Sequence, residues 1–422
     1  MERKINISDV EIMAPVGSWE SLAAAINSGA NSIYFGVQGL NMRSASSVNF
    51  TLDDLATIIQ RCKESDVKTY LTLNTVLYDD ELAYMREVVA RAKAEGITAV
   101  IVSDQAAMIE ARKAEVEVHI STQLNISNIE SVAFYAQWAD VVVLARELDL
   151  KQVRSIYDQI VERDIRGPKG ELVEIEMFVH GALCMAVSGK CYLSLHEAWK
   201  SANRGACRQI CRRSYDVKDI ETGAELVVDN KYIMSPQDLC TLEFLGEMIE
   251  AGVRVLKIEG RARGAEYVST VVGGYREALQ YIISDGEYSA EQAGAIMDRL
   301  KRVFNRGFWG GYYLGHKVGK ELGEWTRSYG SSATRKKVYV GKVTNFFSKI
   351  SVVEVKIEAS PLSVGDELLF VGDTTGAVEF KLDELRDAAG NIVEQLAQGD
   401  VCSVFCGEKT VRRGDKLYIM RE

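Results

Sequence analysis

The feature that most constrains the fold is a regular alternation of short apolar segments with amphipathic helical patterns between residues 11 and 260. The apolar segments are rich in β-branched residues, which is typical of parallel strands buried on both faces. Eight such strands with intervening helices predict an α/β fold of the (β/α)8, TIM-like barrel class. The predicted strands span residues 11–16, 32–37, 68–74, 99–104, 117–122, 140–145, 174–181 and 254–260.

An open, doubly wound sheet is the alternative architecture for this pattern. Its dinucleotide-binding form carries G-x-G-x-x-G after the first strand, and the corresponding segment here, APVGSWES, lacks it. The first helix is expected to begin after Ser18, a suitable N-cap, and to end near Gly29. The barrel is therefore the preferred interpretation.

The chain divides into two predicted domains. Residues 1–327 form the barrel, which carries a long insert at about 182–250 after the seventh strand. In a barrel this insert starts at the carboxyl end of a strand, and active sites are built at that end of the barrel. After a polar linker, residues 335–422 contain short strands separated by Gly and Asp turns, which predict a small C-terminal β-barrel.

The insert contains five of the eight cysteines: Cys184, Cys191, Cys207, Cys211 and Cys240. Three or four thiolates gathered by one loop can ligate Zn²⁺ or an iron–sulfur cluster, and ligand type alone leaves both open. The alternatives are that the cysteines are small buried residues, or that one is a catalytic thiol near His180.

The composition bears on location and partners. The N-terminus has no apolar segment of signal-peptide length and no stretch has membrane-helix length, so a cytoplasmic protein without a membrane partner is expected. A net charge of −10 argues against an extended nucleic-acid-binding surface. A local basic group in the insert is still able to contact RNA phosphates, or is a solvated loop. Its members are Lys200, Arg204, Arg208, Arg212 and Arg213, with Arg335, Lys336 and Lys337 as a weaker second group.

Polar residues at the ends of the predicted strands should line the barrel mouth. They are Asn74, Gln123, Arg146, His180 and Glu259, with Arg43 and Arg261 just beyond strand ends. Arginine binds carboxylates through two parallel hydrogen bonds, so the arginines are candidates for an anionic substrate. The structural alternative for Arg146 and Arg261 is a local ion pair with a neighbouring acid. The structural alternative for His180 is a hydrogen-bonded position in the core, and His119, which lies inside a strand, is expected to be structural.

The segment from Glu176 to Ser194, EMFVHGALCMAVSGKCYLS, resembles the signature of the peptidase U32 family. Supporting stretches are APVGSWESLAAAINSGANSIYFG, LNMRSASSVNFT, HISTQLNISN, RELDL, KIEGRARGAEYV and FNRGFWGGYY. The resemblance implies an oxygen-independent hydroxylation factor that carries a 4Fe–4S cluster and acts on tRNA wobble uridine, ribosomal RNA or a ubiquinone precursor. RNA-modifying members depend on prephenate. A barrel followed by one small β-barrel, which resembles domain 2 of elongation factors, is most similar to the tRNA-modifying members.

The resemblance also implies roles for individual residues. Four cysteines would hold the cluster: Cys184 and Cys191 match the signature, and Cys207 and Cys240 are chosen for the other places, with Cys211 as competitor. From their positions at the ends of barrel strands, and not from the resemblance, His180 and Glu259 are predicted to be catalytic. The expected substrate-binding residues, with prephenate as co-substrate, are Arg43, Asn74, Gln123, Arg146 and Arg261.

The expected function is formation of 5-hydroxyuridine at the wobble position of tRNA, with the anticodon loop as partner. The first alternative is a U32-type peptidase, although the sequence contains neither HExxH nor GxSxG. In that case Cys184 or Cys191 would be the nucleophile. The second is a zinc-stabilised RNA-binding protein without catalysis. No feature of the sequence indicates an oligomeric state.

Overall fold

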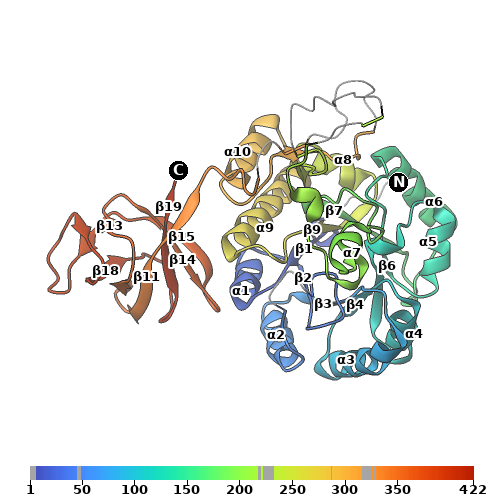
Figure 1. The fold of residues 1–422 in the computed structure, drawn as a ribbon, viewed down its shortest axis with the longest axis horizontal. Coiled ribbons are helices and arrows are strands. Elements are labelled where there is room, and N and C mark those ends of the chain that lie inside the picture. Colours follow the sequence, from blue (N-terminus) through green and yellow to red (C-terminus); the bar gives the residue numbers. More distant parts are fainter. Residues whose placement is uncertain are drawn as a thin grey trace.

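The computed structural model describes residues 6–44, 49–216, 220–221, 232–286, 288–315, 325–326 and 329–422. A parallel barrel lies beside an antiparallel β unit (Figure 1). Each barrel strand pairs with its neighbours in parallel, and β9 closes the ring by pairing with both β7 and β1. The barrel strands are β1 (Glu11–Pro15), β2 (Ser32–Phe35), β3 (Lys68–Leu73), β4 (Ala99–Val102), β5 (Glu117–Ile120), β6 (Val141–Val143), β7 (Glu174–Ala182) and β9 (Val253–Ile258).

All eight predicted strands are present, and their ends differ from the prediction by at most two residues. The closed ring confirms the barrel and excludes the open sheet. The strands are almost entirely buried because helices cover them outside and side chains fill the interior.

Helices surround the barrel (Figure 1). The Ser18 side chain caps the first of them by accepting a hydrogen bond from the Ser21 amide, and that helix ends before Gly29, whose φ is +84°. Both ends agree with the prediction. The helices are α1 (Trp19–Asn27), α2 (Asp54–Lys63), α3 (Leu82–Glu95), α4 (Gln105–Lys113), α5 (Ile129–Ala136), α6 (Leu150–Glu162), α8 (Leu245–Glu250), α9 (Ala265–Leu279) and α10 (Ala290–Leu300).

The segment that follows β7 folds back over the barrel mouth. It begins with a loop and the short helix α7 (Leu193–Ala198), and later forms β8 (Asp238–Cys240). Strand β8 runs antiparallel to the end of β7, and β10 (Phe308–Trp309) adds to β8 in parallel. These pairings fix the insert to the carboxyl end of the barrel.

The C-terminal strands form antiparallel sheets around a hydrophobic core of their own. The larger sheet has the order β15-β14-β19-β11-β12-β18-β16, and β13 pairs with β17. The strands are β11 (Lys336–Phe347), β12 (Val352–Ile357), β13 (Leu362–Ser363), β14 (Glu367–Gly372), β15 (Gly376–Lys381), β16 (Leu385–Arg386), β17 (Gln395–Leu396), β18 (Val401–Phe405) and β19 (Lys416–Arg421).

This β unit packs against the barrel through β14 and β15, which contact α1 and α9. The side-chain amide of Asn27 donates to the carbonyl of Thr375 at 3.2 Å. A Cβ on Gly376 would lie 2.6 Å from the backbone nitrogen of Ala24, so only glycine permits this approach. Leu369 and Val371 join the core of the barrel, which makes the contact hydrophobic at its centre.

Candidate functional site

A cavity of about 250 Å³ lies at the carboxyl ends of the barrel strands, beneath the insert. Its floor comes from residues that follow barrel strands, and its roof comes from the loop and helix after β7. All five predicted substrate-binding residues and Glu259 line it, whereas His180 does not. The geometry of a barrel explains this convergence, because the ends of parallel strands meet around one opening.

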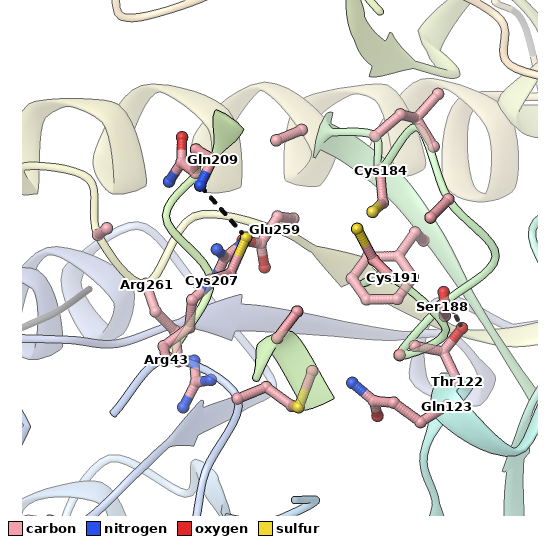
Figure 2. Close-up of a pocket in the computed structure, with 18 of the residues that line it drawn as sticks. Arg43, Thr122, Gln123, Cys184, Ser188, Cys191, Cys207, Gln209, Glu259 and Arg261 are labelled. Carbon is pink, nitrogen blue, oxygen red and sulfur yellow. Dashed lines mark hydrogen bonds and ion pairs between the residues drawn. The ribbon is translucent and has the colours of Figure 1, made fainter. Parts of the chain in front are cut away.

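Four thiols of the insert line the cavity: Cys184, Cys191, Cys207 and Cys211. Cys184 is exposed and the other three are half-buried. In Figure 2 the sulfur atoms of Cys184 and Cys191 point toward each other, and Cys207 lies beside Glu259. The Cys207 sulfur accepts a hydrogen bond from the backbone nitrogen of Gln209 at 3.4 Å. The insert therefore places a group of accessible soft donors on the wall of the cavity.

Cys240 does not line the cavity, although it was predicted to be one of the four cluster ligands. It is buried in β8, with its sulfur 3.9 Å from the Tyr275 hydroxyl and 3.8 Å from the Met297 sulfur. Burial raises the pKa of its thiol to about 12. Because β8 turns back along β7, its last residue packs against the surrounding helices and not toward the mouth. Cys211, predicted as the competitor, is the fourth cysteine at the cavity.

Cationic side chains line the same cavity as the thiols. Seven lining residues carry a positive charge and only Glu259 carries a negative one; the cations are Arg43, Arg146, Arg212, Lys257, Arg261, Arg263 and Arg306. Several of them have partners: Lys257 pairs with Glu176 and Arg306 pairs with Asp238. In a chain with a net charge of −10, this local excess indicates an anionic ligand.

Glu259 is ionised and interacts with the arginines of the cavity. It pairs with Arg43 at 2.5 Å and accepts a hydrogen bond from the Tyr34 hydroxyl at 3.1 Å. Burial would raise the pKa of its carboxyl, but the guanidinium of Arg43, with those of Arg261 and Arg146, lowers it to about 2. As placed, Glu259 holds Arg43 and is not poised to donate a proton.

Arg261 and Arg146 are fixed from one side only. Arg261 is buried, and its Nη1 donates to Asn41 at 3.1 Å and to Thr72 at 2.9 Å. Arg146 lies 3.8 Å from the ring centre of Phe178 and donates to a backbone carbonyl at 3.4 Å. Each has a buried Nε–H that finds no acceptor among the described residues. A ligand with carboxylate oxygens would satisfy such donors.

Amide side chains complete the floor. The Asn74 side-chain nitrogen lies 3.3 Å from both the Ser121 hydroxyl and the Gln123 side-chain oxygen. Thr122 is hydrogen-bonded to Ser188 of the cysteine loop at 3.5 Å, which ties the roof to the barrel (Figure 2). These groups offer neutral donors and acceptors next to the thiols, as recognition of a heterocyclic ring requires.

His180 was predicted to be catalytic, and the structure places it outside the cavity. A register irregularity between Phe178 and His180 turns the histidine to the outer side of β7, opposite Ile258. There it contacts Tyr267, Tyr275 and Phe308. Burial lowers the pKa of its imidazole to about 3, so the ring is neutral and packed in the core.

Comparison with known proteins places this geometry in a family. The model of peptidase family U32 matches residues 17–322. The chain belongs to peptidase family U32.

Relatives of this U32 protein carry two kinds of name. A protein named collagenase from Porphyromonas gingivalis (strain W83) is 56% identical over 98% of both chains. The tRNA hydroxylation protein P1 of Bacillus subtilis is 30% identical and covers 90% of this chain and 88% of its own. The 23S rRNA 5-hydroxycytidine C2501 synthase of Escherichia coli is 34% identical over 71% of this chain and 44% of its own. Family membership indicates an enzyme.

The basic residues of the insert are mostly structural in this U32 protein. Arg204 forms two hydrogen bonds to Glu81, at 2.8 and 2.9 Å. Arg212 donates to the carbonyl groups of Leu183 and Pro236, both at 2.6 Å, and Arg213 pairs with Glu197 at 2.5 Å. Arg204 therefore joins the insert to the barrel, whereas Arg212 and Arg213 have partners within the insert. Their local excess in the sequence could not distinguish internal partners from RNA phosphates.

Lys200, Arg208 and Arg213 are exposed, and of these Arg213 is paired with Glu197. In the second predicted group, Arg335 lies 4.0 Å from Glu379 and Lys337 pairs with Glu266 at 2.8 Å. Both pairs link the start of the C-terminal unit to neighbouring segments. Among the residues that the structure describes, no helix combines the length and apolar character needed to cross a bilayer.

Proposed function

We propose that this U32 protein hydroxylates an RNA base, forming 5-hydroxyuridine at the wobble position of tRNA in a reaction that depends on prephenate and a 4Fe–4S cluster. The observation that supports this most directly is the composition of one cavity. Four thiols and several arginines line it together, and no histidine is among its described lining residues. This arrangement suits redox chemistry beside an anion better than hydrolysis.

Cys184, Cys191, Cys207 and Cys211 would hold the cluster. No three His, Cys, Asp or Glu side chains in the described part of the chain are placed to bind a single metal ion. A 4Fe–4S cluster has a different requirement, because each of its four thiolates binds a separate iron and the donors therefore surround a volume. Four thiols on the wall of one cavity match this donor set. When bound, the cluster would supply one-electron redox chemistry.

The arginines would bind the dianionic co-substrate. Arg261 and Arg146 both have an unsatisfied buried N–H, and Arg43 pairs with Glu259, which lies near all three arginines. Guanidinium groups bind carboxylates through paired hydrogen bonds, and the fixed orientation of Arg261 reduces the entropy lost on binding. Prephenate carries two carboxylates, so an excess of cations at this position supports it as a ligand.

The target nucleotide would enter from the exposed side of the cavity, near Cys184. Enzymes that modify a base bind it outside the stack, and bases in an anticodon loop can be splayed out at low cost. Asn74 and Gln123 offer amide groups that could pair with the edge of uracil. The tRNA hydroxylation protein of Bacillus subtilis aligns over nearly the full length of both chains, which favours tRNA as substrate.

Proteolysis is the second candidate function, and the name of the relative at 56% identity favours it. A cysteine peptidase needs a base that activates its thiol. The cavity thiols have no histidine among the described lining residues, and His180 is neutral and faces away. The chemistry of the cavity thus supports hydroxylation over peptide hydrolysis.

The experiment is nucleoside mass spectrometry of tRNA from a deletion strain in which other routes to 5-hydroxyuridine are removed. We expect loss of 5-hydroxyuridine derivatives, restored by the wild-type gene and by Cys240→Ala, but not by Cys184→Ala. Unchanged tRNA would refute the proposed reaction. Anaerobically purified protein that contains no iron and cleaves denatured collagen would establish the peptidase instead.

A further inference from the structure

The outer face of α7 carries aromatic side chains that the protein does not bury. Tyr192, the residue before the helix, is 76% exposed, and Trp199, the residue after it, is 88% exposed. His196 between them is also exposed. Large exposed rings in a group are uncommon on a protein surface unless they bind something.

Three exposed rings follow one another along this short segment. Tyr192 and His196 occupy positions i and i+4, which share a helix face, and Trp199 follows directly after the last helical residue. The adjacent residues Leu193 and Ser194 line the cavity. The helix therefore contributes residues to the candidate active site and also carries exposed rings at its two ends and between them, here called the aromatic stripe.

The backbone at Trp199 makes its position unusual. Its φ is +52°, a left-handed conformation that bulky residues rarely adopt and that glycine or asparagine normally occupies at the end of a helix. The fold gains no buried contact from a ring that is almost fully exposed. A tryptophan at this position is therefore better explained by what it contacts outside the chain.

Cations flank the aromatic stripe. Lys190, Lys200 and Arg208 are exposed, and none of them pairs with a carboxylate of the described residues. The neighbouring acid Glu197 is neutralised by Arg213 at 2.5 Å. A positively charged rim around a cavity is notable because the whole chain carries a net charge of −10.

We propose that the α7 platform, defined as Tyr192, His196 and Trp199 with Lys190, Lys200 and Arg208, stacks the unpaired nucleotides next to the target base of an RNA loop. Bases stack on exposed aromatic rings while nearby cations contact the phosphates, which is a common way of binding single-stranded RNA. This inference rests on the proposed function, because it assigns to the same site the means of holding its RNA.

Direct binding tests the platform. The probe is a fluorescent anticodon stem-loop RNA with an unmodified wobble uridine, titrated anaerobically by anisotropy. Trp199→Ala and Tyr192→Ala should each raise the Kd about ten-fold, whereas Trp199→Phe should retain most of the affinity. Phe134→Ala is the matched control, since Phe134 is 57% exposed on α5, outside the cavity. Lys200→Gln and Arg208→Gln should also reduce the salt dependence of binding.

The outcomes separate this inference from the proposed reaction. If Trp199→Ala and Tyr192→Ala bind the RNA as tightly as Phe134→Ala does, the platform is refuted, whatever the deletion strain shows. If both variants bind weakly while the deletion strain keeps its 5-hydroxyuridine, the platform stands and the proposed reaction falls. A third outcome is that the wild type does not bind the RNA but binds denatured collagen, and that both variants lose this collagen binding. The platform would then bind a protein substrate, and the inference would be wrong.

Discussion

A row of charged side chains crosses the interior of the barrel beneath the cavity, and it supports a quantitative prediction. Lys257 pairs with Glu176 at 2.5 Å, and the other carboxylate oxygen of Glu176 lies 3.8 Å from Nδ1 of His119. Nε2 of His119 is 3.3 Å from Glu117, which pairs with Lys169. Glu176 and His119 are almost completely inaccessible to solvent.

The electrostatics of this row depend on an ionised histidine. Burial lowers the pKa of His119, but its carboxylate neighbours Glu117 and Glu176 raise it from 6.5 to about 9. At 1.36 kcal/mol per pKa unit, that rise corresponds to about 3 kcal/mol of stabilisation. A raised pKa stabilises the fold fully below pH 6.5, and this contribution is lost as pH rises toward 9.

The perturbation is Glu176→Gln, which keeps the shape of the side chain and removes its charge. Lys257 and His119 would then be buried cations without their shared carboxylate, and such a change costs about 3–5 kcal/mol. The assay is amide hydrogen exchange in β5, β7 and β9 at neutral pH, which reports the local free energy of opening. Glu130→Gln, which breaks an exposed pair with Arg163, is the control and should have little effect.

Two further measurements make the reasoning refutable. The double variant Glu176→Gln/Lys257→Met should recover most of the loss, because it removes the unpaired ammonium as well. In the Glu176→Gln variant the decline of stability with rising pH should begin at a lower pH than in the wild type, since His119 has lost one carboxylate. If Glu176→Gln changes protection by less than about 1 kcal/mol, Glu176 is neutral in the folded protein and the row is not ionic.

The remaining predictions concern the site and its rim. Cys211→Ser should lower the iron content of anaerobically purified protein, while Cys240→Ser should not; the reverse result would restore Cys240 as a ligand. Arg261→Lys should weaken prephenate binding about ten-fold or more in calorimetric titration, because charge-assisted hydrogen bonds contribute about 1.5–3 kcal/mol and lysine lacks the planar fork. An unchanged affinity would remove Arg261 from the binding site. Trp199→Asn should leave the melting temperature unchanged or slightly raised, since relief of left-handed strain is worth about 1 kcal/mol; a clear loss of stability would show that the ring packs in the fold.

The barrel could be predicted from the sequence because its strands are defined by local composition. Parallel strands covered on both faces appear as apolar runs, so each strand was located to within two residues. The convergence of Asn74, Gln123 and Arg146 followed from the same fact, since strand ends in a barrel share one opening. These predictions needed no knowledge of contacts distant in the sequence.

The structure departs from the expected site where distant segments pair. Cys240 and His180 lie opposite each other in the antiparallel pairing of β8 with β7, and both are buried behind the barrel wall. That pairing joins residues about sixty positions apart and is not encoded by the periodicity of either segment. Spacing alone therefore could not choose between Cys211 and Cys240.

The partners of the insert's basic residues could not be predicted from the sequence either, because most of them are distant along the chain. These partners determine how the site is assembled. Arg204 connects the thiol-bearing insert to the barrel through Glu81, and Arg212 stabilises the insert internally through its backbone carbonyl groups. The thiols belong to the insert, whereas Arg43, Arg146 and Arg261 belong to the barrel. The two halves of the proposed chemistry therefore meet only if the insert is docked, and residues far from the reacting atoms should control activity as strongly as those that line the cavity.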